Sequence, residues 1–510
     1  MINLLGSPRR LCDGLSRREL LTLGGLSALG IGLADHFTWA APSPTRVPHF
    51  GKAKACILIF LYGSPPQHET FDPKPDAVAE VRGEIGSMPS VVPGVRVCEL
   101  LPRTARIMDQ ITVVRSMTHR YPEHGVAYAV SGIPTYTPEL ETRPRDRRHW
   151  PYIGSVVDYL ARSPGVRYSE PRGSEMPRNI ALPWMLNSKT DILVNAGPFA
   201  AFLGQQHDPL WTDFTGTGTR IAPRYSDGQA REFHDPYAGT VPDGRFILST
   251  EGRLRDDIPI ERLNLRQSLL SQFEQAQRAG PPSPAGRGVG GEGTNAIHDL
   301  HRRRAYNLLT SNAVHQALDI GREPTVSRER YGMTLFGQSC LAARRLVEAG
   351  TKFVTVFWDG FGQFASCGWD THANHYPRLR EYLLPGFDLA FPALIDDLRQ
   401  RGLLDETLVL CMSEHGRTPQ IDSRPRGAGR HHWSRVYSMA LAGGGVAKGR
   451  VVGSSDRLGG EVRDTPVSPK DILATSFHLL GIDPHTHVTD AQSRPYPIAG
   501  DGEVRPELLG

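Results

Sequence analysis

The sequence predicts an α/β fold with a doubly wound, mainly parallel central sheet flanked by helices. Three observations predict it: short apolar runs recur along the chain, helical patterns separate several of them, and the runs end in polar residues or glycine. Continuous apolar runs of this kind are typical of strands buried on both faces of a parallel sheet. Strands that alternate with helices form doubly wound cores, whose ligands bind beyond the carboxyl ends of the strands.

Five strands and two long helices are expected in this core. The first strand, Ala55–Tyr62, ends at Gly63-Ser64-Pro65-Pro66. The other strands are expected at residues 111–114, 353–357, 408–412 and 436–441. Helical patterns cover Tyr331–Glu348 before the third strand and Tyr376–Gln400 before the fourth.

The middle of the chain lacks this pattern. Residues 135–250 are rich in Pro, Gly, Arg and aromatic residues without a clear period, which predicts long irregular insertions over the core. Two helices are expected at 253–278 and 295–320. Between them, residues 280–293 form a Pro/Gly tract that predicts a flexible surface loop.

The N-terminus resembles a twin-arginine export signal. It combines Ser16-Arg17-Arg18-Glu19-Leu20-Leu21, an apolar run from Leu20 to Leu33, and Ala40-Ala41 before a proline. The run is shorter than the roughly 20 residues that span a bilayer, so no stable transmembrane span is expected. An amphipathic helix with a chance arginine pair is the alternative. We expect export by the twin-arginine translocase and a periplasmic or secreted protein.

The expected domain organisation follows from these features. It comprises a signal peptide at 1–41, a spacer at 42–54, an α/β domain at 55–484 with insertions and a helical region within 135–330, and a C-terminal tail at 485–510.

Charge and cysteine content exclude several classes of protein. The 510-residue chain has a net charge of only +4, which gives no overall basic field for a nucleic-acid partner. Its 6 cysteines are scattered and contain no CxxC pair, unlike a disulfide framework or a thiolate metal site.

Histidines and carboxylates collect where the predicted strands end. They occur in the segments 67–75, 118–125, 368–375, 413–419 and 429–433. A parallel sheet would bring these segments together along one edge. Imidazole and carboxylate ligands suit Zn, Mn or Fe, and two metals about 4 Å apart would need about six such side chains. Any one histidine could be a solvated loop residue or a helix cap, but the set predicts a metal site.

Spacing separates stronger from weaker candidates within two of these segments. Asp370 and His372 are two residues apart and can lie on one side of an extended segment, whereas His375 would need a turn. His431 and His432 point opposite ways if the segment is extended, so only one faces the site easily, and we favour His432.

These segments together resemble the exported bacterial family called Domain of Unknown Function 1501, within the wider alkaline phosphatase and sulfatase superfamily. The resemblance covers the chain from about Ala55 to Pro484. The matching motifs are Gly-Ser-Pro-Pro-Gln-His-Glu-Thr-Phe-Asp-Pro-Lys-Pro from Gly63, Ser116-Met117-Thr118-His119 with His124, Gly368-Trp369-Asp370-Thr371-His372-Ala373-Asn374, Glu414 with Gly416-Arg417-Thr418-Pro419, Gly429-Arg430 with His432-Trp433, and Ala442-Gly443-Gly444-Gly445.

The resemblance implies an alkaline phosphatase-like fold and metal-binding roles. Ser-Glu-His-Gly looks like the Asp-His-Gly metal pair of sulfatases and phosphatases, which implies that Glu414 and His415 bind metal. Asp370, His372 and His432 would form the second cluster, and Glu69 is a further candidate ligand. The implied cofactor is one or two divalent ions (Zn, Mn, Ca or Fe) per chain.

Three positions depart from the family's pattern. The family usually has Asp where Glu69 stands, Phe where His415 stands, and Asp where His431 stands. Relatives that have Phe at the position of His415 would have no metal ligand there.

The sequence leaves open which residue is the nucleophile. In the superfamily, a Ser, Thr or modified Cys opens the helix after the second strand, where the helix N-terminus stabilises the anionic ester. Here either Thr118 serves, or His119 and His124 act as ligands or as general acid and base around a metal-bound hydroxide. Arg417 could clamp the anionic group of the substrate, or it could form a salt bridge to a neighbouring carboxylate.

The leading hypothesis is an exported metal-dependent hydrolase of small-molecule or polysaccharide esters of phosphate or sulfate. The alternative is a non-catalytic exported protein that binds sulfated or anionic polysaccharide on the same fold. A phosphomutase-like transferase is a third hypothesis, and export away from cytosolic sugar phosphates counts against it.

Overall fold

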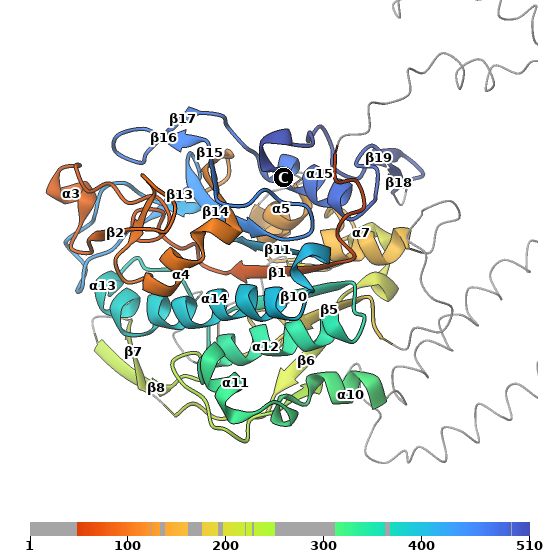
Figure 1. Ribbon diagram of the computed structural model, residues 1–510, viewed down its shortest axis with the longest axis horizontal. Helices are drawn as coiled ribbons and strands as arrows, with labels where there is room; N and C mark the ends of the chain where they lie inside the picture. Colours follow the sequence, from red (N-terminus) through yellow and green to blue (C-terminus); the bar gives the residue numbers. More distant parts are fainter. Residues whose placement is uncertain are drawn as a thin grey trace, which may run out of the picture. The chain divides into compact units, whose positions relative to one another are not determined.

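The described residues build a nine-stranded mixed sheet (Figure 1). In spatial order its strands are β15 (Arg450–Val452), β4 (Ile111–Met117), β14 (Tyr437–Ala442), β11 (Thr407–Met412), β1 (Ala55–Leu61), β10 (Phe353–Trp358), β5 (Asn179–Leu182), β6 (Leu210–Phe214) and β9 (Phe246–Leu248). Relative to β1, the strands β14 and β9 run antiparallel and the others run parallel. The predicted fold class, with a mainly parallel sheet, is therefore confirmed.

The computed structural model describes residues 48–122, 124–132, 138–161, 176–191, 197–219, 221–226, 229–249, 312–362, 368–490 and 492–510. Almost all of them belong to the unit Gly51–Gly510. The predicted signal peptide at 1–41, the helix at 253–278 and the loop at 280–293 lie outside the described residues.

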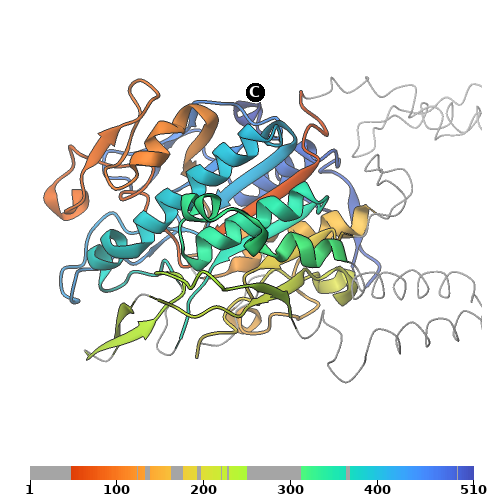
Figure 2. The ribbon, with the colours of Figure 1, turned by 60° about the horizontal axis from the view of Figure 1, so that its bottom comes forward.

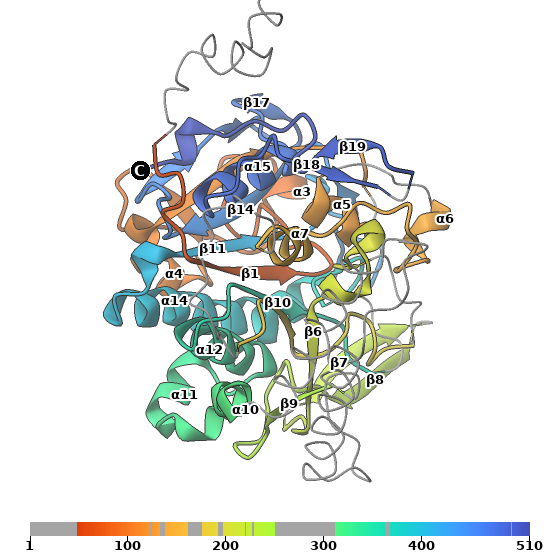
Figure 3. The same cartoon turned by 90° about the vertical axis from the view of Figure 1, so that its right-hand side faces the viewer.

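Helices cover both faces of the sheet because β1 is apolar on both sides. Ile57 and Ile59 of β1 contribute to one core, which includes α12 (Leu335–Glu348) and α14 (Leu384–Gln400). Leu58 and Phe60 contribute to the other core, which includes α5 (Val126–Ser131), α7 (Ile153–Leu160) and α15 (Pro469–Leu479). The helices α12 and α14 pack side by side (Figure 2), and α5, α7 and α15 lie on the opposite face (Figure 3).

Shorter elements complete the described fold. The helices are α3 (Ala79–Arg82), α4 (Pro102–Arg106), α6 (Pro138–Glu141), α10 (Asn312–Leu318), α11 (Thr325–Tyr331) and α13 (His375–Arg378). The strands form the pairs β2 (Ser87–Pro89) with β3 (Arg96–Cys98), β7 (Ile221–Ser226) with β8 (Gln229–His234), β12 (Gly416–Arg417) with β13 (His432–Trp433), β16 (Ser454–Ser455) with β17 (Val462–Asp464), and β18 (His487–Thr489) with β19 (Pro495–Pro497). Single 3₁₀ turns occur at Met108–Gln110, Ala201–Leu203, Gln205–His207, Ile320–Arg322, Leu404–Glu406 and Pro506–Leu508.

The five predicted strands are confirmed, and the two long helices are confirmed with changes at their ends. Helix α12 begins at Leu335 rather than Tyr331, because Gly332 adopts a positive φ of 87° and the Thr334 side chain caps the new N-terminus. The second helix begins as α13 and continues into α14 through a π-helical turn at Leu379–Leu383.

The middle of the chain contributes more to the core than its sequence predicts. Within 135–250, where irregular cover is expected, β5, β6 and β9 extend the central sheet beyond β10. These strands contain five residues or fewer, so they are too short to stand out as apolar runs. Helix α10 lies within the predicted helix at 295–320, whose residues up to 311 are outside the described part.

The last residues, expected as a C-terminal tail, pack against the core. Leu508 is fully buried, and Leu509 forms a β-bridge with Val446. The expected boundary at residue 484 therefore falls inside the packed structure.

The direction of β14 decides which segments meet at one edge of the sheet. The parallel strands β4, β11, β1 and β10 end at this edge, whereas β14 begins there, with Tyr437 opposite Met117. The segment that precedes β14 therefore joins the segments that follow its neighbours. A short ladder between Arg417 and His432 brings the segment after β11 against the segment before β14.

Candidate metal centre

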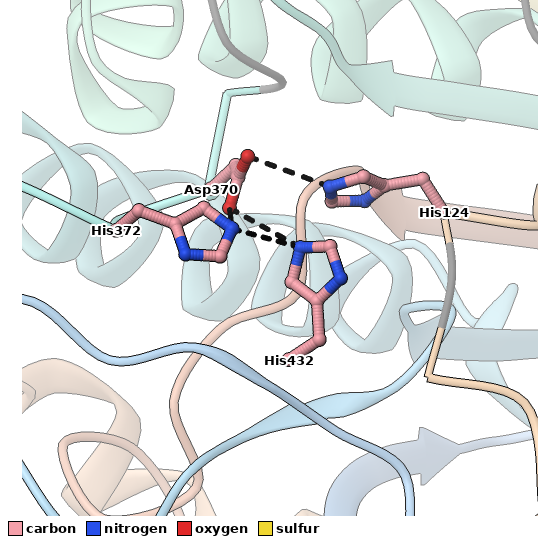
Figure 4. A group of neighbouring side chains, drawn as sticks. All are labelled: His124, Asp370, His372 and His432. Carbon is pink, nitrogen blue, oxygen red and sulfur yellow. Dashed lines mark hydrogen bonds and ion pairs between the residues drawn. The ribbon is translucent and has the colours of Figure 1, made fainter.

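Four side chains converge at this edge of the sheet (Figure 4). His124 lies between β4 and α5, Asp370 and His372 follow β10, and His432 lies in β13. Their ligand atoms lie within 4.8 Å of one another. The structure thus brings together residues from three remote segments, and all four were candidates on sequence alone.

The distances within this group match the size of a metal coordination shell. The Nε2 atom of His372 lies 2.9 Å from Nε2 of His432 and 3.0 Å from Oδ1 of Asp370. Oδ1 of Asp370 lies 3.7 Å from Nε2 of His432, and its Oδ2 lies 3.4 Å from Nε2 of His124. Tetrahedral ligands at about 2.0–2.1 Å from a zinc ion lie about 3.3–3.4 Å apart. The group therefore suits one small divalent cation.

Outer hydrogen bonds fix the tautomers of two of these histidines. Nδ1 of His432 lies 3.0 Å from the carbonyl oxygen of Pro122, which can only accept, so His432 donates from Nδ1. Nδ1 of His124 lies 2.9 Å from Oε1 of Glu414, a carboxylate that also accepts from the backbone N–H of Gly63 at 2.8 Å. When the ring is neutral, as metal binding requires, each of these two histidines consequently directs a lone pair from Nε2 toward the group. Metal-binding histidines are oriented in this way by an acceptor on the far nitrogen.

Asp370 is held as an anion at the centre of the group. Burial by itself raises the pKa of Asp370, but the Arg417 guanidinium and the three histidines outweigh burial and hold this pKa well below its usual range. Nη2 of Arg417 lies 2.6 Å from Oδ1 of Asp370.

Arg417 is fully buried, and its interactions are with the protein itself. Its Nε donates to the carbonyl oxygen of Ser64 at 3.0 Å, and its Nη1 donates to that of Arg430 at 3.2 Å. This arrangement matches the salt-bridge alternative for Arg417: the residue orients a candidate metal ligand.

A second group consists of His124, Glu414 and His415, and its ligand atoms also lie within 4.8 Å of one another. Oε2 of Glu414 and Nε2 of His415 are both buried without a hydrogen-bond partner. Burial, together with the positive charge of the nearby Arg417 side chain, holds the pKa of His415 well below its usual range. Nδ1 of His415 donates to the carbonyl oxygen of Gly416 at 2.8 Å. Both orphaned atoms can therefore act as ligands, so the residues fit one or two cations.

His124 lies between the two groups. Burial lowers the pKa of its metal-free imidazole, but hydrogen bonds to Asp370 and Glu414 outweigh burial and raise the pKa to about 9. The ring therefore holds a proton at neutral pH in the metal-free chain, and a cation would have to displace it.

Glu69, a candidate ligand on sequence, lies outside both groups. It is buried, and its Oε1 accepts hydrogen bonds from Arg430 at 2.6 Å and 3.1 Å. Its Oε2 lies 3.6 Å from Nε2 of His375, so His375 also faces away from the cluster and toward Glu69. Glu69 thereby anchors Arg430, two residues before His432.

His119 and Thr118 also lie outside both groups. His119 uses both ring nitrogens on the main chain: Nε2 lies 2.6 Å from the carbonyl oxygen of Glu414, and Nδ1 accepts from the N–H of Tyr121 at 3.1 Å. Burial lowers the pKa of His119 to about 4, so the ring is neutral. The backbone N–H of Thr118 donates to the carbonyl oxygen of Val467 at 2.9 Å. Of the two histidines in this segment, only His124 belongs to the ligand groups.

Two side chains beside the site make contacts that were not predicted from the sequence. Gln67 follows β1 and forms two hydrogen bonds with the backbone of Arg417, at 2.8 Å and 2.9 Å. His431, set aside in favour of His432, contacts the opposite edge of the His372 ring. Both are polar residues within motifs rich in ligands, which is the only signal that the sequence offers for them.

Together, the fold and the site define an α/β protein with a candidate metal centre at the strand ends. The sequence matches the family model "Protein of unknown function (DUF1501)" over residues 53–509. The chain belongs to this family, as its motifs indicate. The match extends past residue 484 to the packed C-terminus.

Comparison with solved structures gives distant matches. No curated protein matches the sequence. Among solved structures, Ps i-CgsB is similar with a TM-score of 0.35 and 11% identity over 88% of this chain and 75% of that chain. The PsFucS1 sulfatase from Pseudoalteromonas sp. has a TM-score of 0.35 and 11% identity, over 96% of this chain and 75% of that chain. A structure of Ps i-CgsB in complex with k-i-k-neocarrahexaose has a TM-score of 0.35 and 10% identity, over 84% and 72% of the two chains.

None of the described helices is both long enough and apolar enough to cross a membrane.

Proposed function

We propose that this protein is a metal-dependent hydrolase of phosphate or sulfate esters. One observation carries the proposal: Asp370 and the Nε2 atoms of three histidines converge at the distances of a coordination shell. His372 and His432 place two nitrogen atoms 2.9 Å apart, which requires either a shared proton or a cation between them. For His432, the acceptor at Nδ1 leaves a lone pair on Nε2, which can bind a cation or accept a proton from His372.

A divalent cation in such a site lowers the pKa of a coordinated water toward about 7 and neutralises charge on the ester oxygens. Asp370 supplies the negative charge that holds the cation, and Arg417 fixes the direction of that carboxylate. The His372 side chain is 41% exposed, whereas that of Asp370 is 11% exposed, so solvent reaches the group from the side of His372. A substrate would approach from the same side.

A non-catalytic function on the same fold is the second candidate, and the number of ligands favours it. Three histidines and one aspartate complete a four-coordinate shell, and closed shells of this kind are typical of structural zinc. In that case the cation would hold three loops together for a surface that binds anionic polysaccharide.

Metal content and turnover, measured together, test the proposal. We expect the purified chain to bind one or two divalent ions and, when loaded, to hydrolyse members of a panel of chromogenic aryl phosphates and sulfates. His432→Ala should lose bound metal and turnover, while His487→Ala, at an exposed histidine in β18, should keep both. Bound metal without turnover across the panel would favour the non-catalytic candidate, and absence of metal from the unaltered chain would refute both.

We also propose that the chain is exported by the twin-arginine route to the periplasm or beyond. The motif around Arg17 and Arg18 supports this proposal. Replacing both arginines with lysine should retain the protein in the cytoplasm in a fractionation experiment, and unchanged export would count against this route.

A further inference from the structure

We propose that His431 and Asp422 form a hydrogen-bonded chain that positions His372 as a metal ligand. This inference rests on the proposed metal site and names two residues that neither group of convergent ligand atoms includes. Their role would be to direct the ring of His372 and fix its tautomer, without contact to the metal.

The chain runs from the cluster to the surface through three side chains. Nδ1 of His372 lies 2.9 Å from Nδ1 of His431, and Nε2 of His431 lies 3.1 Å from Oδ2 of Asp422. The side chain of His431 is 48% exposed, whereas that of Asp422 is 13% exposed. His372 therefore has a partner on both ring nitrogens: the cluster on one side and His431 on the other.

The chemistry of these groups assigns the protons. Hydrogen bonds from Arg424 and His431 hold the pKa of Asp422 below its usual range, so its carboxylate is an acceptor. His431 must therefore donate from Nε2, which leaves a lone pair on its Nδ1. His372 then donates from Nδ1 and directs the lone pair of Nε2 toward Asp370 and His432. This is the tautomer that a metal ligand needs.

All three histidines of the site then share one arrangement. His124 has the Glu414 carboxylate at Nδ1, His432 has the Pro122 carbonyl, and His372 has His431. His372 is the most exposed of the three rings, at 41%, so it depends most on a partner for its orientation.

Backbone hydrogen bonds hold Asp422 and His372, the two ends of this hydrogen-bonded series, in place. Asp422 and Gly429 exchange two backbone hydrogen bonds of 2.8 Å. A Cβ atom at Gly429 would lie 1.9 Å from the carbonyl oxygen of His372, so only glycine permits this approach. The N–H of Arg430 donates to the carbonyl oxygen of Thr371 at 3.1 Å. The contact between His431 and His372 is therefore imposed by the packing of two loops.

The affinity of the full chain for Zn²⁺, measured by competition with a chelator, tests the proposal. Mutation of the outer hydrogen-bond partner of a metal-binding histidine typically lowers metal affinity by about 10–100-fold. His431→Phe should therefore weaken Zn²⁺ binding by about that factor. His431→Gln should recover most of the affinity, because its amide oxygen can accept the proton of His372. Asp422→Asn should weaken binding less than His431→Phe does, since an amide oxygen remains.

Two control variants match these changes away from the site. His487→Phe replaces an exposed histidine in β18. Asp490→Asn alters an aspartate that, like Asp422, accepts from a backbone N–H two residues later and pairs with a nearby arginine. Neither control should change the affinity for Zn²⁺. Equal affinity in His431→Phe and the unaltered chain would overturn the role of His431 and leave the proposed function standing.

A second measurement separates failure of the positioning role from failure of the metal site. Nitrogen-15 NMR of selectively labelled histidine reports the tautomer of His372 in the metal-free chain. We expect a proton on Nδ1 of His372 in the unaltered chain, whether or not Nε2 is also protonated, and a mixture of protonated and unprotonated Nδ1 in His431→Phe. The same tautomer in both proteins would overturn the inference. An unaltered chain that shows the expected proton on Nδ1 but binds no Zn²⁺ would refute the proposed function and the ligand role of His372, and would leave only the hydrogen-bonded contact.

Discussion

Replacing Glu69 with Gln distinguishes a structural carboxylate from a metal ligand. Glu69 and Arg430 are both fully buried as side chains and lie 2.6 Å apart. Glu69→Gln keeps the volume and one acceptor oxygen, but it leaves the Arg430 cation buried without a counter-charge. Breaking one partner of a buried pair costs about 3–5 kcal/mol. Because the retained side-chain oxygen can still accept both hydrogen bonds from Arg430, we expect a loss of about 3 kcal/mol, at the lower end of that range.

The free energy of unfolding of Glu69→Gln, measured in urea, gives this loss directly. Metal content of the folded variant should stay at the level of the unaltered chain, because Glu69 contacts Arg430 and lies outside both candidate metal groups. Arg430→Met serves as the partner variant. The double variant should cost less than the sum of the two single variants, since it removes both charges together.

The pH dependence of stability supplies a further check on Glu69. Burial raises its pKa, but Arg430 and His375 outweigh burial and hold the pKa below its usual range. The carboxylate therefore contributes stability at neutral pH, and this contribution is lost as the pH falls through the folded-state pKa. The reasoning would be refuted if Glu69→Gln kept full stability and lost its metal, since Glu69 would then be a ligand.

Three further predictions follow from the site and the core. In the metal-free chain the raised pKa of His124 contributes stability at low pH that is lost as the pH rises toward about 9, so unfolding measured from pH 6 to 10 should show a decline that His124→Ala lacks. Thr118→Ala should keep metal content, because the ligand atoms of both groups come from other residues; loss of turnover with metal retained would identify Thr118 as the nucleophile. Leu508→Ala should lower the free energy of unfolding by about 2–5 kcal/mol, and no loss would show that the C-terminus is dispensable for packing.

Local patterns in the sequence predict much of the core. The strands β1, β4, β10, β11 and β14 are apolar runs because both faces of the sheet are covered, and each can be recognised without its neighbours. The strands β5, β6 and β9 cannot be recognised in this way, because their short segments are defined by pairing with distant residues. The sequence also indicates which segments carry the site, since polar residues follow the buried runs.

Which of those polar residues meet is decided by the tertiary structure. Strand direction brings His432 to the ends of the neighbouring strands, because β14 runs antiparallel to β4 and β11. Backbone geometry turns His124 into the cluster, whereas His119 bonds to the main chain and Glu69 pairs with Arg430. The sequence by itself therefore determined the fold class and the pool of candidate ligands, since both depend on local composition. Only the tertiary structure could select among them, because coordination requires atoms from remote segments to lie within a few ångströms of one another.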